Sequence, residues 1–337
     1  MFNKFLGVCL IIIIGLAACR KDKDVFIPTE LPSNIDSTII VPSVGDISKL
    51  YDALAVKPVT LTATLGTTNC IYTPKGTQIC FDENDFVLPD GTTATGDIEF
   101  HIIEILNRAE MIMSNKPTYS NGKLLGSGGE FHISVTQNGQ ELTLKQGAQL
   151  SLIYYSIESP FIPNYLLFYG TETPNGDVNW DSVSTNQVNI FEPFTTQNGT
   201  IIFGYELETD SIGWINCDYF YPLGLENLTD IKTYVPKEHN DQNTALFIAF
   251  KNLNAVAGMY NFVAESPADY NYFTAGVSYL APIGEEVTLV GISEIGEDEW
   301  VSAFKDITIQ NGQTDTLSFS PTTLEAFEQQ LNDLFVP

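Results

Sequence analysis

Apolar and polar residues alternate along most of the chain after residue 58, which is the pattern of half-buried β-strands. The segments Val59–Leu65, Ile98–Ile102 and Phe131–Val135 show it clearly. Tight-turn dipeptides punctuate these segments: Asp90-Gly91, Asn121-Gly122, Asn138-Gly139, Asn175-Gly176, Asn198-Gly199 and Asn311-Gly312. Such regular punctuation favours a sandwich or barrel over βαβ units. We therefore expect a mainly β protein with two β-sandwich-like (Ig-like) domains.

Helical periodicity is confined to two short segments. The first starts at Asp46 and places four apolar residues on one face: Ile47, Leu50, Tyr51 and Leu54. The second follows a capping box of Thr322 and Glu325 and also has one apolar face: Leu324, Phe327, Leu331 and Leu334. We expect this C-terminal amphipathic helix to dock onto the second sheet, with binding to a partner as the alternative.

Composition divides the chain into five segments. Residues 1–18 have the pattern of a lipoprotein signal peptide, and residues 19–45, charged and then rich in proline, that of a flexible tether. Residues 46–157 predict a first β-sandwich domain. Residues 158–220 hold four prolines and little periodicity, and predict a loop-rich connection with strands. Residues 221–337 predict a second β-sandwich domain that ends in the C-terminal helix.

The first 19 residues have the features of an export signal. Lys4 precedes an apolar run from Leu10 to Leu16, and two alanines then precede Cys19. The run is too short for a membrane span, which needs about 20 apolar residues. The ending Leu-Ala-Ala-Cys resembles the lipobox of bacterial lipoproteins. That resemblance implies cleavage before Cys19 and lipid on Cys19, with several acyl chains for stable anchoring. A plain secretory signal with an incidental cysteine is the alternative.

The residues after Cys19 bear on where the protein is delivered. Lys21-Asp22 resembles the surface-export signal of Bacteroidota-type lipoproteins, although Lys23 interrupts the acidic run. The alternative is the start of a solvated linker. We expect a lipid-anchored protein of the cell envelope, at the outer membrane and exposed on the surface.

Charge excludes some partners. The 337-residue chain has a formal net charge of −27, and removing the signal would take away Lys4 and no acid. An anionic body repels phosphate backbones, so we expect no nucleic-acid partner. It also discourages lying flat on anionic lipid, so the lipid on Cys19 is expected to make the membrane contact.

Two series of residues carry a resemblance to a known family. They comprise Gly96–Ile105, Met111, Pro117-Thr118, Asn121–Leu125, Ser127–Gly129 and Phe131–Ile133, and then Gly213–Asp218. Together they resemble a family of uncharacterised flavobacterial-type lipoproteins over residues 58–320. The first series is similar to the β-sandwich module of ankyrins and netrin receptors. The resemblance implies a fold and an envelope address, and it implies no activity.

Cysteine positions predict one disulfide. Cys70 and Cys80 flank the turn signal Thr73–Gly76, so a hairpin would bring them face to face. An exported protein permits such a bond. Cys217 is then the odd cysteine, and we expect it to be a buried small apolar residue.

Catalytic and metal motifs are sparse. The sequence has no G-x-S-x-G elbow and no zinc-type spacing among its three histidines and five cysteines, so we assign no catalytic residues. Asp177, Asn179 and Asp181 form D-x-N-x-D, which can place three oxygens on calcium, the one cofactor that the sequence suggests. A solvated acidic loop is the alternative. A glycan hydrolase with two distant acids also stays open.

Polar and aromatic residues in two places suggest a ligand platform: Trp214, Asn216, Asp218, Tyr219, Tyr221, Tyr270, Tyr272 and Phe273. Structural roles in the core are the alternative. We expect a non-enzymatic interaction or scaffold module of the cell envelope, with an envelope protein or glycan as partner. The alternatives are a glycan- or nutrient-binding lipoprotein beside an outer-membrane transporter, and a glycan hydrolase.

Overall fold

A computed structural model describes residues 45–156, 165–174, 176–183, 188–195, 201–222, 227–261, 269–275 and 280–335. All of them fall within one compact unit. The signal peptide, Cys19, Lys21, Asp22 and the tether up to residue 44 lie outside the described residues. The expectation of a mainly β protein with a C-terminal helix is confirmed. Among the described helices, none has the length and apolar character needed to cross a membrane.

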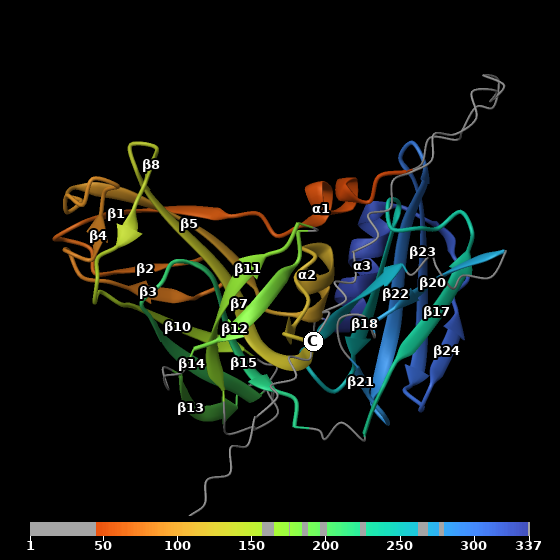
Figure 1. Cartoon of the computed structure of the whole chain (residues 1–337). Coiled ribbons are helices and arrows are strands. Elements are labelled where there is room, and N and C mark those ends of the chain that lie inside the picture. Colours follow the sequence, from red (N-terminus) through yellow and green to blue (C-terminus); the bar gives the residue numbers. More distant parts are fainter. Residues whose placement is uncertain are drawn as a thin grey trace, which may run out of the picture. The chain divides into compact units, whose positions relative to one another are not determined.

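The N-terminal part of the chain builds a large antiparallel sheet. Its strands, in spatial order, are β1 (Val59–Thr64), β5 (Asp97–Ile105), β7 (Lys123–Gln137), β15 (Gly213–Phe220), β11 (Leu166–Glu172) and β12 (Val178–Ser182). Two short strands, β6 (Tyr119–Ser120) and β8 (Gln140–Glu141), pair antiparallel with the two ends of the long strand β7. These strands are labelled in Figure 1.

A second sheet packs against the inner face of the first. Its order is β13 (Val188–Thr195), β14 (Ile201–Thr209), β10 (Leu150–Ser156), β3 (Gln78–Cys80) and β2 (Cys70–Tyr72). Phe131 of β7 contacts Tyr154 of β10 with ring centroids 4.7 Å apart, and Tyr154 stacks on Tyr205 of β14. The two sheets therefore share one buried aromatic core. A two-stranded piece, β4 (Phe86–Val87) with β9 (Thr143–Leu144), completes this part.

The segment 158–220, expected to be a loop-rich connection with strands, contributes strands to both N-terminal sheets. Strands β11 to β15 come from it and pair within the two N-terminal sheets, where β15 lies between β7 and β11. Strands β11 and β12 pair as neighbours, and so do β13 and β14, on either side of the dipeptides Asn175-Gly176 and Asn198-Gly199. The pairings of β15 with β7 and of β14 with β10 join strands remote in sequence, which a local pattern does not predict. Pro193 lies in β13, at a register shift and on the edge of its sheet, where a missing N–H is tolerated.

The C-terminal part forms an eight-stranded sheet. Its order is β24 (Gln313–Thr316), β17 (Ile231–Pro236), β20 (Tyr270–Thr274), β19 (Val256–Asn261), β18 (Thr244–Phe250), β22 (Glu286–Gly296), β23 (Glu299–Thr308) and β25 (Ser320–Thr322). Only β17 and β24 pair in parallel among these described strands. The pair β16 (Leu228–Thr229) and β21 (Ala281–Pro282) lies outside this sheet. Both faces of β18 are buried, so it belongs to two hydrophobic clusters at once.

Three helices share the second hydrophobic cluster. They are α1 (Ser48–Leu54), α2 (Arg108–Met113) and α3 (Leu324–Phe335), and Figure 1 shows them near one another beside β18 and β22. Helix α3 contacts the C-terminal sheet through Phe327, whose ring centroid lies 5.7 Å from that of Phe304. Its buried face ends on Phe335 and leaves Leu334 exposed, and Thr323, one residue later than expected, caps it by accepting a hydrogen bond from the Ala326 N–H.

Candidate functional site

The cysteine pair suggested by the sequence is a disulfide in the structure. Cys70 of β2 lies directly opposite Cys80 of β3, and their sulfur atoms are bonded. Cys217 is a buried free thiol in β15, and burial raises the pKa of that thiol well above its usual value. A thiol that is buried and protonated does not serve as a nucleophile, so Cys217 is a core residue.

The residues of the suggested ligand platform do not share a surface. Trp214, Asn216 and Asp218 face one side of β15, whereas Tyr219 faces the other, where its ring meets Tyr165 at 5.1 Å. Both sides of β15 are buried, because Tyr219 faces the core shared with the second sheet and Trp214 faces the second hydrophobic cluster. Six of the eight platform residues are buried, Tyr221 is half-buried, and Tyr270 is exposed. Aromatic content alone did not predict exposure, because exposure depends on what packs over the strand.

The D-x-N-x-D residues are engaged elsewhere. Asp177 is buried and accepts hydrogen bonds from the hydroxyls of two tyrosines, Tyr119 and Tyr260. The side chains of Asn179 and Asp181 accept hydrogen bonds from the backbone and the amide of Asn121. In the part of the chain that the structure describes, no three His, Cys, Asp or Glu residues gather to hold a metal ion. The three motif residues therefore accept hydrogen bonds from two tyrosines and from the turn between β6 and β7.

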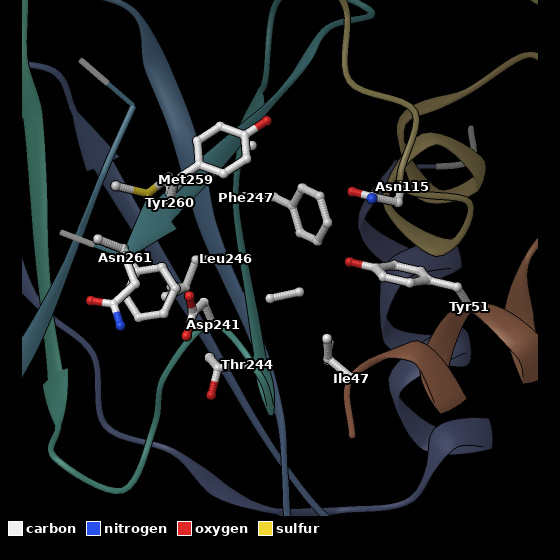
Figure 2. A pocket seen from close by; sticks show the side chains of 13 residues that line it. Ile47, Tyr51, Asn115, Asp241, Thr244, Leu246, Phe247, Met259, Tyr260 and Asn261 are labelled. Carbon is white, nitrogen blue, oxygen red and sulfur yellow. The ribbon is translucent and has the colours of Figure 1, made fainter. Parts of the chain in front are cut away.

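A pocket of about 420 Å³ lies where α1 and the turn after α2 face the C-terminal sheet. Figure 2 shows Tyr51 and Asn115 on one side, Phe247 opposite them, and Met259, Tyr260 and Asn261 farther along the sheet. Its remaining polar lining includes Asp241 and Thr244. This volume lies within the range of small-molecule sites, which is roughly 300–1,000 Å³.

Local backbone chemistry places Asn115 in this pocket. Helix α2 ends at Met113, and Asn115 follows it with a left-handed φ of 51°. Asparagine is among the few residues that adopt this conformation readily at a helix C-terminus. The turn brings Asn115 opposite Phe247, and the same residue also lines a second pocket of about 390 Å³. Tyr51 of α1 is the other residue common to both pockets.

The second pocket contains a charged network. The Lys116 ammonium donates to the Gly176 carbonyl at 2.5 Å, lies 3.3 Å from Glu172 Oε1, and sits 4.9 Å above the Trp214 ring. The Trp214 indole N–H also donates to Glu172 Oε1, at 3.0 Å. His132 lies against the same indole, and its burial lowers the pKa of the imidazole. Lys116 and Glu172 thus form an ion pair in the lining of the second pocket.

Tyrosine hydroxyls near the first pocket stay protonated at neutral pH. Burial, followed by the hydrogen bond with Asp177, raises the pKa of Tyr260 well above its usual value. Burial also raises the pKa of Tyr119 to about 12 and that of Tyr51 beyond the ordinary range. These groups can donate hydrogen bonds, and they do not ionise to act as bases.

Two acids that were not singled out together by sequence reasoning lie on the covered face of β7 and β15. Glu130 and Asp218 are both fully buried, and burial raises the pKa of each carboxyl well above its usual value. Neither lines the two pockets described above. The one sequence signal for Glu130 was its place after Gly129 and directly before the alternating segment that starts at Phe131. The structure shows that this part of β7 is buried, so an acid lies within a buried strand.

Comparison of the chain with protein-family models, curated proteins and solved structures found no match. The class of the protein therefore follows from its fold and its site. It is a mainly β protein with two N-terminal sheets, a C-terminal sheet, and an open pocket where its helices meet the C-terminal sheet.

Proposed function

We propose that this protein is a lipid-anchored, non-catalytic binding protein of the cell envelope, and that its ligand occupies the pocket between Tyr51 and the C-terminal sheet. The observation that carries the proposal is the composition of that pocket. Apolar surface from Ile47, Leu246 and Phe247 faces polar groups of Asn115 and Asn261 in one cavity of small-molecule size. Such a mixture binds a ligand by apolar contact and orients it by hydrogen bonds.

The polar groups favour a neutral ligand with hydrogen-bond donors. Asn261 Oδ1 is buried and has no hydrogen-bond donor among the described residues. Asp241 adds a carboxylate to the same wall, and the chain has a net charge of −27, so an anionic ligand would be repelled. A sugar or another neutral polyol with an apolar face matches these features. This supports the glycan- or nutrient-binding form of the interaction module.

The arrangement of acids favours binding over hydrolysis. A glycosidase needs two carboxyl groups facing one cleft, about 5–9.5 Å apart. Asp241 is the one carboxylate among the described residues that line the first pocket. The second pocket is lined by Asp52 and Glu172, and Glu172 is bound by Lys116 and by the Trp214 indole. The buried acids Glu130 and Asp218 are sealed from both cavities.

The anchoring part of the proposal rests on the N-terminal sequence. The lipobox-like Leu16–Cys19 supports lipid on Cys19, and the proline-rich segment 20–45 supports a tether. Lys21-Asp22 supports delivery to the cell surface. Labelling cells with an alkyne-bearing fatty acid tests this, because the wild type should take up label and Cys19→Ser should not. Protease treatment of intact and of lysed cells then separates surface exposure from a periplasmic location.

Ligand binding is tested with a panel of neutral mono- and oligosaccharides, amino acids and short peptides, read out by thermal unfolding and tryptophan fluorescence. We expect a neutral carbohydrate to raise the melting temperature of the wild type. Tyr51→Phe and Asn261→Ala should weaken binding about tenfold, because each removes one hydrogen-bonding group. Tyr270→Phe, an exposed tyrosine that does not line the pocket, is the matched control. Equal binding by all three variants would contradict this site, and cleavage of a bound glycan would contradict the non-catalytic assignment.

A further inference from the structure

Four polar residues lie together on the covered face of the N-terminal sheet. In the pairing of β7 with β15, Glu130 lies opposite Asn216 and Ser127 lies opposite Asp218. Cross-strand partners share a face, and so do Asn216 and Asp218, two residues apart on one strand. All four side chains have exposed fractions of 2% or less.

The C-terminal sheet closes this cluster through the connection between β18 and β19. Asn254 in that connection donates its amide hydrogens to the carbonyls of Leu106 and Ser127, at 3.1 and 3.0 Å. The backbone carbonyl of Asn254 accepts the Ser127 N–H at 2.8 Å. The Arg108 guanidinium of α2 donates to the Lys251 carbonyl at 2.9 Å in the same connection. The cluster therefore lies where the N-terminal and C-terminal parts of the molecule meet.

Four buried side-chain oxygens of this cluster accept no hydrogen bond from the described residues. Ser127 Oγ donates to Asn216 Oδ1 at 3.0 Å, and the Asn216 amide donates to Asp218 Oδ2 at 2.6 Å. Glu130 Oε1, Glu130 Oε2, Asp218 Oδ1 and Asn254 Oδ1 are buried and have no donor among the described residues. Each of these four atoms is an oxygen of a carboxyl or amide group that can act as an acceptor. Buried polar atoms without partners are costly, so the set points to something that binds oxygen lone pairs.

Charge points the same way. Two ionised carboxylates buried together repel one another, and desolvation disfavours both charges. Lys116 is the cation whose field reaches Glu130, but its ammonium is already held by Glu172, the Gly176 carbonyl and the Trp214 ring. Two negative charges surrounded by oxygen acceptors are balanced by one divalent cation, and hard cations such as Ca²⁺ take carboxylate and amide oxygens.

We propose that Glu130 and Asp218 form a buried binding site for a divalent, oxygen-preferring cation of the calcium type, with Asn254 Oδ1 as a neutral ligand. The cation joins a sheet of the N-terminal part to the β18–β19 connection of the C-terminal part. This site is separate from the D-x-N-x-D segment, whose side chains bind tyrosines and Asn121. It is also separate from the ligand pocket, so either proposal can fail without the other.

The test is performed on the full chain. The protein is unfolded in EDTA and refolded with or without CaCl₂, so that a sealed site can load during folding, and metal content is then measured by atomic emission. Terbium replaces calcium in a parallel sample excited through tryptophan, because Trp214 lies on the same face of β15 as Asp218. The isosteric double variant Glu130→Gln/Asp218→Asn removes both charges, and Asp181→Asn is the matched control.

We expect one calcium per wild-type chain and one in Asp181→Asn, with sensitised terbium emission in both. Calcium in hundredfold excess over its dissociation constant should raise the melting temperature by about 5 °C. The double variant should bind less than a tenth as much metal and show no calcium-dependent shift. A wild type that refolds without calcium or terbium and melts at the same temperature with EDTA as with calcium would overturn the proposal. If the double variant fails to fold, the wild-type measurement alone decides the question. If the double variant folds and is more stable than the wild type without calcium, the two carboxyls are protonated in the wild type and hold no cation.

Discussion

Tyr260 of β19 donates a 2.6 Å hydrogen bond to Asp177 Oδ2, which joins the C-terminal sheet to the turn before β12 in the N-terminal sheet. Tyr119 donates to the same oxygen at 2.9 Å. Asp177 is 4% exposed, and Tyr260 lines the proposed ligand pocket. One buried carboxylate thus positions part of a binding wall and connects two parts of the fold.

We expect Asp177→Ala to lower the free energy of unfolding by about 2–3 kcal/mol, because two buried hydroxyls lose a charged acceptor. Urea denaturation followed by tryptophan fluorescence measures this. Asp181→Ala, at the exposed end of β12, should cost less than about 1 kcal/mol. A cost for Asp177→Ala no larger than that of the control would contradict the role assigned to this acid.

The disulfide between Cys70 and Cys80 closes a short loop. We expect the double variant Cys70→Ser/Cys80→Ser to lose about 2–3 kcal/mol, because the unfolded chain regains the entropy that the closed loop withholds. Urea denaturation of the wild type with and without a reducing agent gives the same comparison without a mutation. A reduced wild type as stable as the oxidised one would show that the bond adds no net stability.

Acid should destabilise the region around His239. This imidazole is buried, contacts Ser293 Oγ through Nδ1 at 2.9 Å, and stacks on Phe319 with centroids 4.1 Å apart. Burial lowers its pKa below the usual value, against a smaller opposing effect of Glu238. Above about pH 6.5 the imidazole of His239 is neutral in both the folded and the unfolded state, so its protonation does not reduce the free energy of unfolding. Below that pH, the unfolded state takes up a proton that the folded state resists, so the free energy of unfolding falls.

The difference between wild type and His239→Gln isolates this effect, because other titrating groups are common to both proteins. We expect the wild type to lose more stability than the variant between pH 7 and pH 5, measured by urea denaturation. Parallel curves over that interval would assign the acid sensitivity to other groups.

Gly126 allows close packing of Tyr219. A β-carbon built at Gly126 would overlap the Tyr219 ring, which lies in the buried core. We expect Gly126→Ala to cost about 1–3 kcal/mol, since the ring must move within a packed interior. Gly258→Ala is the matched control, because the nearest atom there is the Tyr260 hydroxyl at 3.3 Å. Thermal and urea unfolding compare the two, and equal costs would show that the Tyr219 ring yields easily.

The local sequence was sufficient for features that depend on near neighbours. Alternation from Val59 and from Phe131 predicted strands, since successive side chains of a strand face opposite sides whatever lies around them. The turn between Cys70 and Cys80 brought these residues into register without distant help. The apolar spacing from Leu324 predicted α3, although the final turn buries Phe335 in place of Leu334.

Tertiary structure decided which faces are covered and which residues meet. The pattern around Trp214 could not reveal that β15 lies between β7 and β11 with both sides buried, so an expected platform became core. The ligand pocket brings Tyr51 together with Asn261, and the buried cluster brings Glu130 together with Asn254. Residues this far apart in sequence meet through strand order and helix docking, which local periodicity does not encode. The sequence by itself determined the strands, the turn-linked disulfide and the export-signal pattern. The tertiary structure decided the pocket and the buried acids, because burial and charge pairing are properties of distant neighbours.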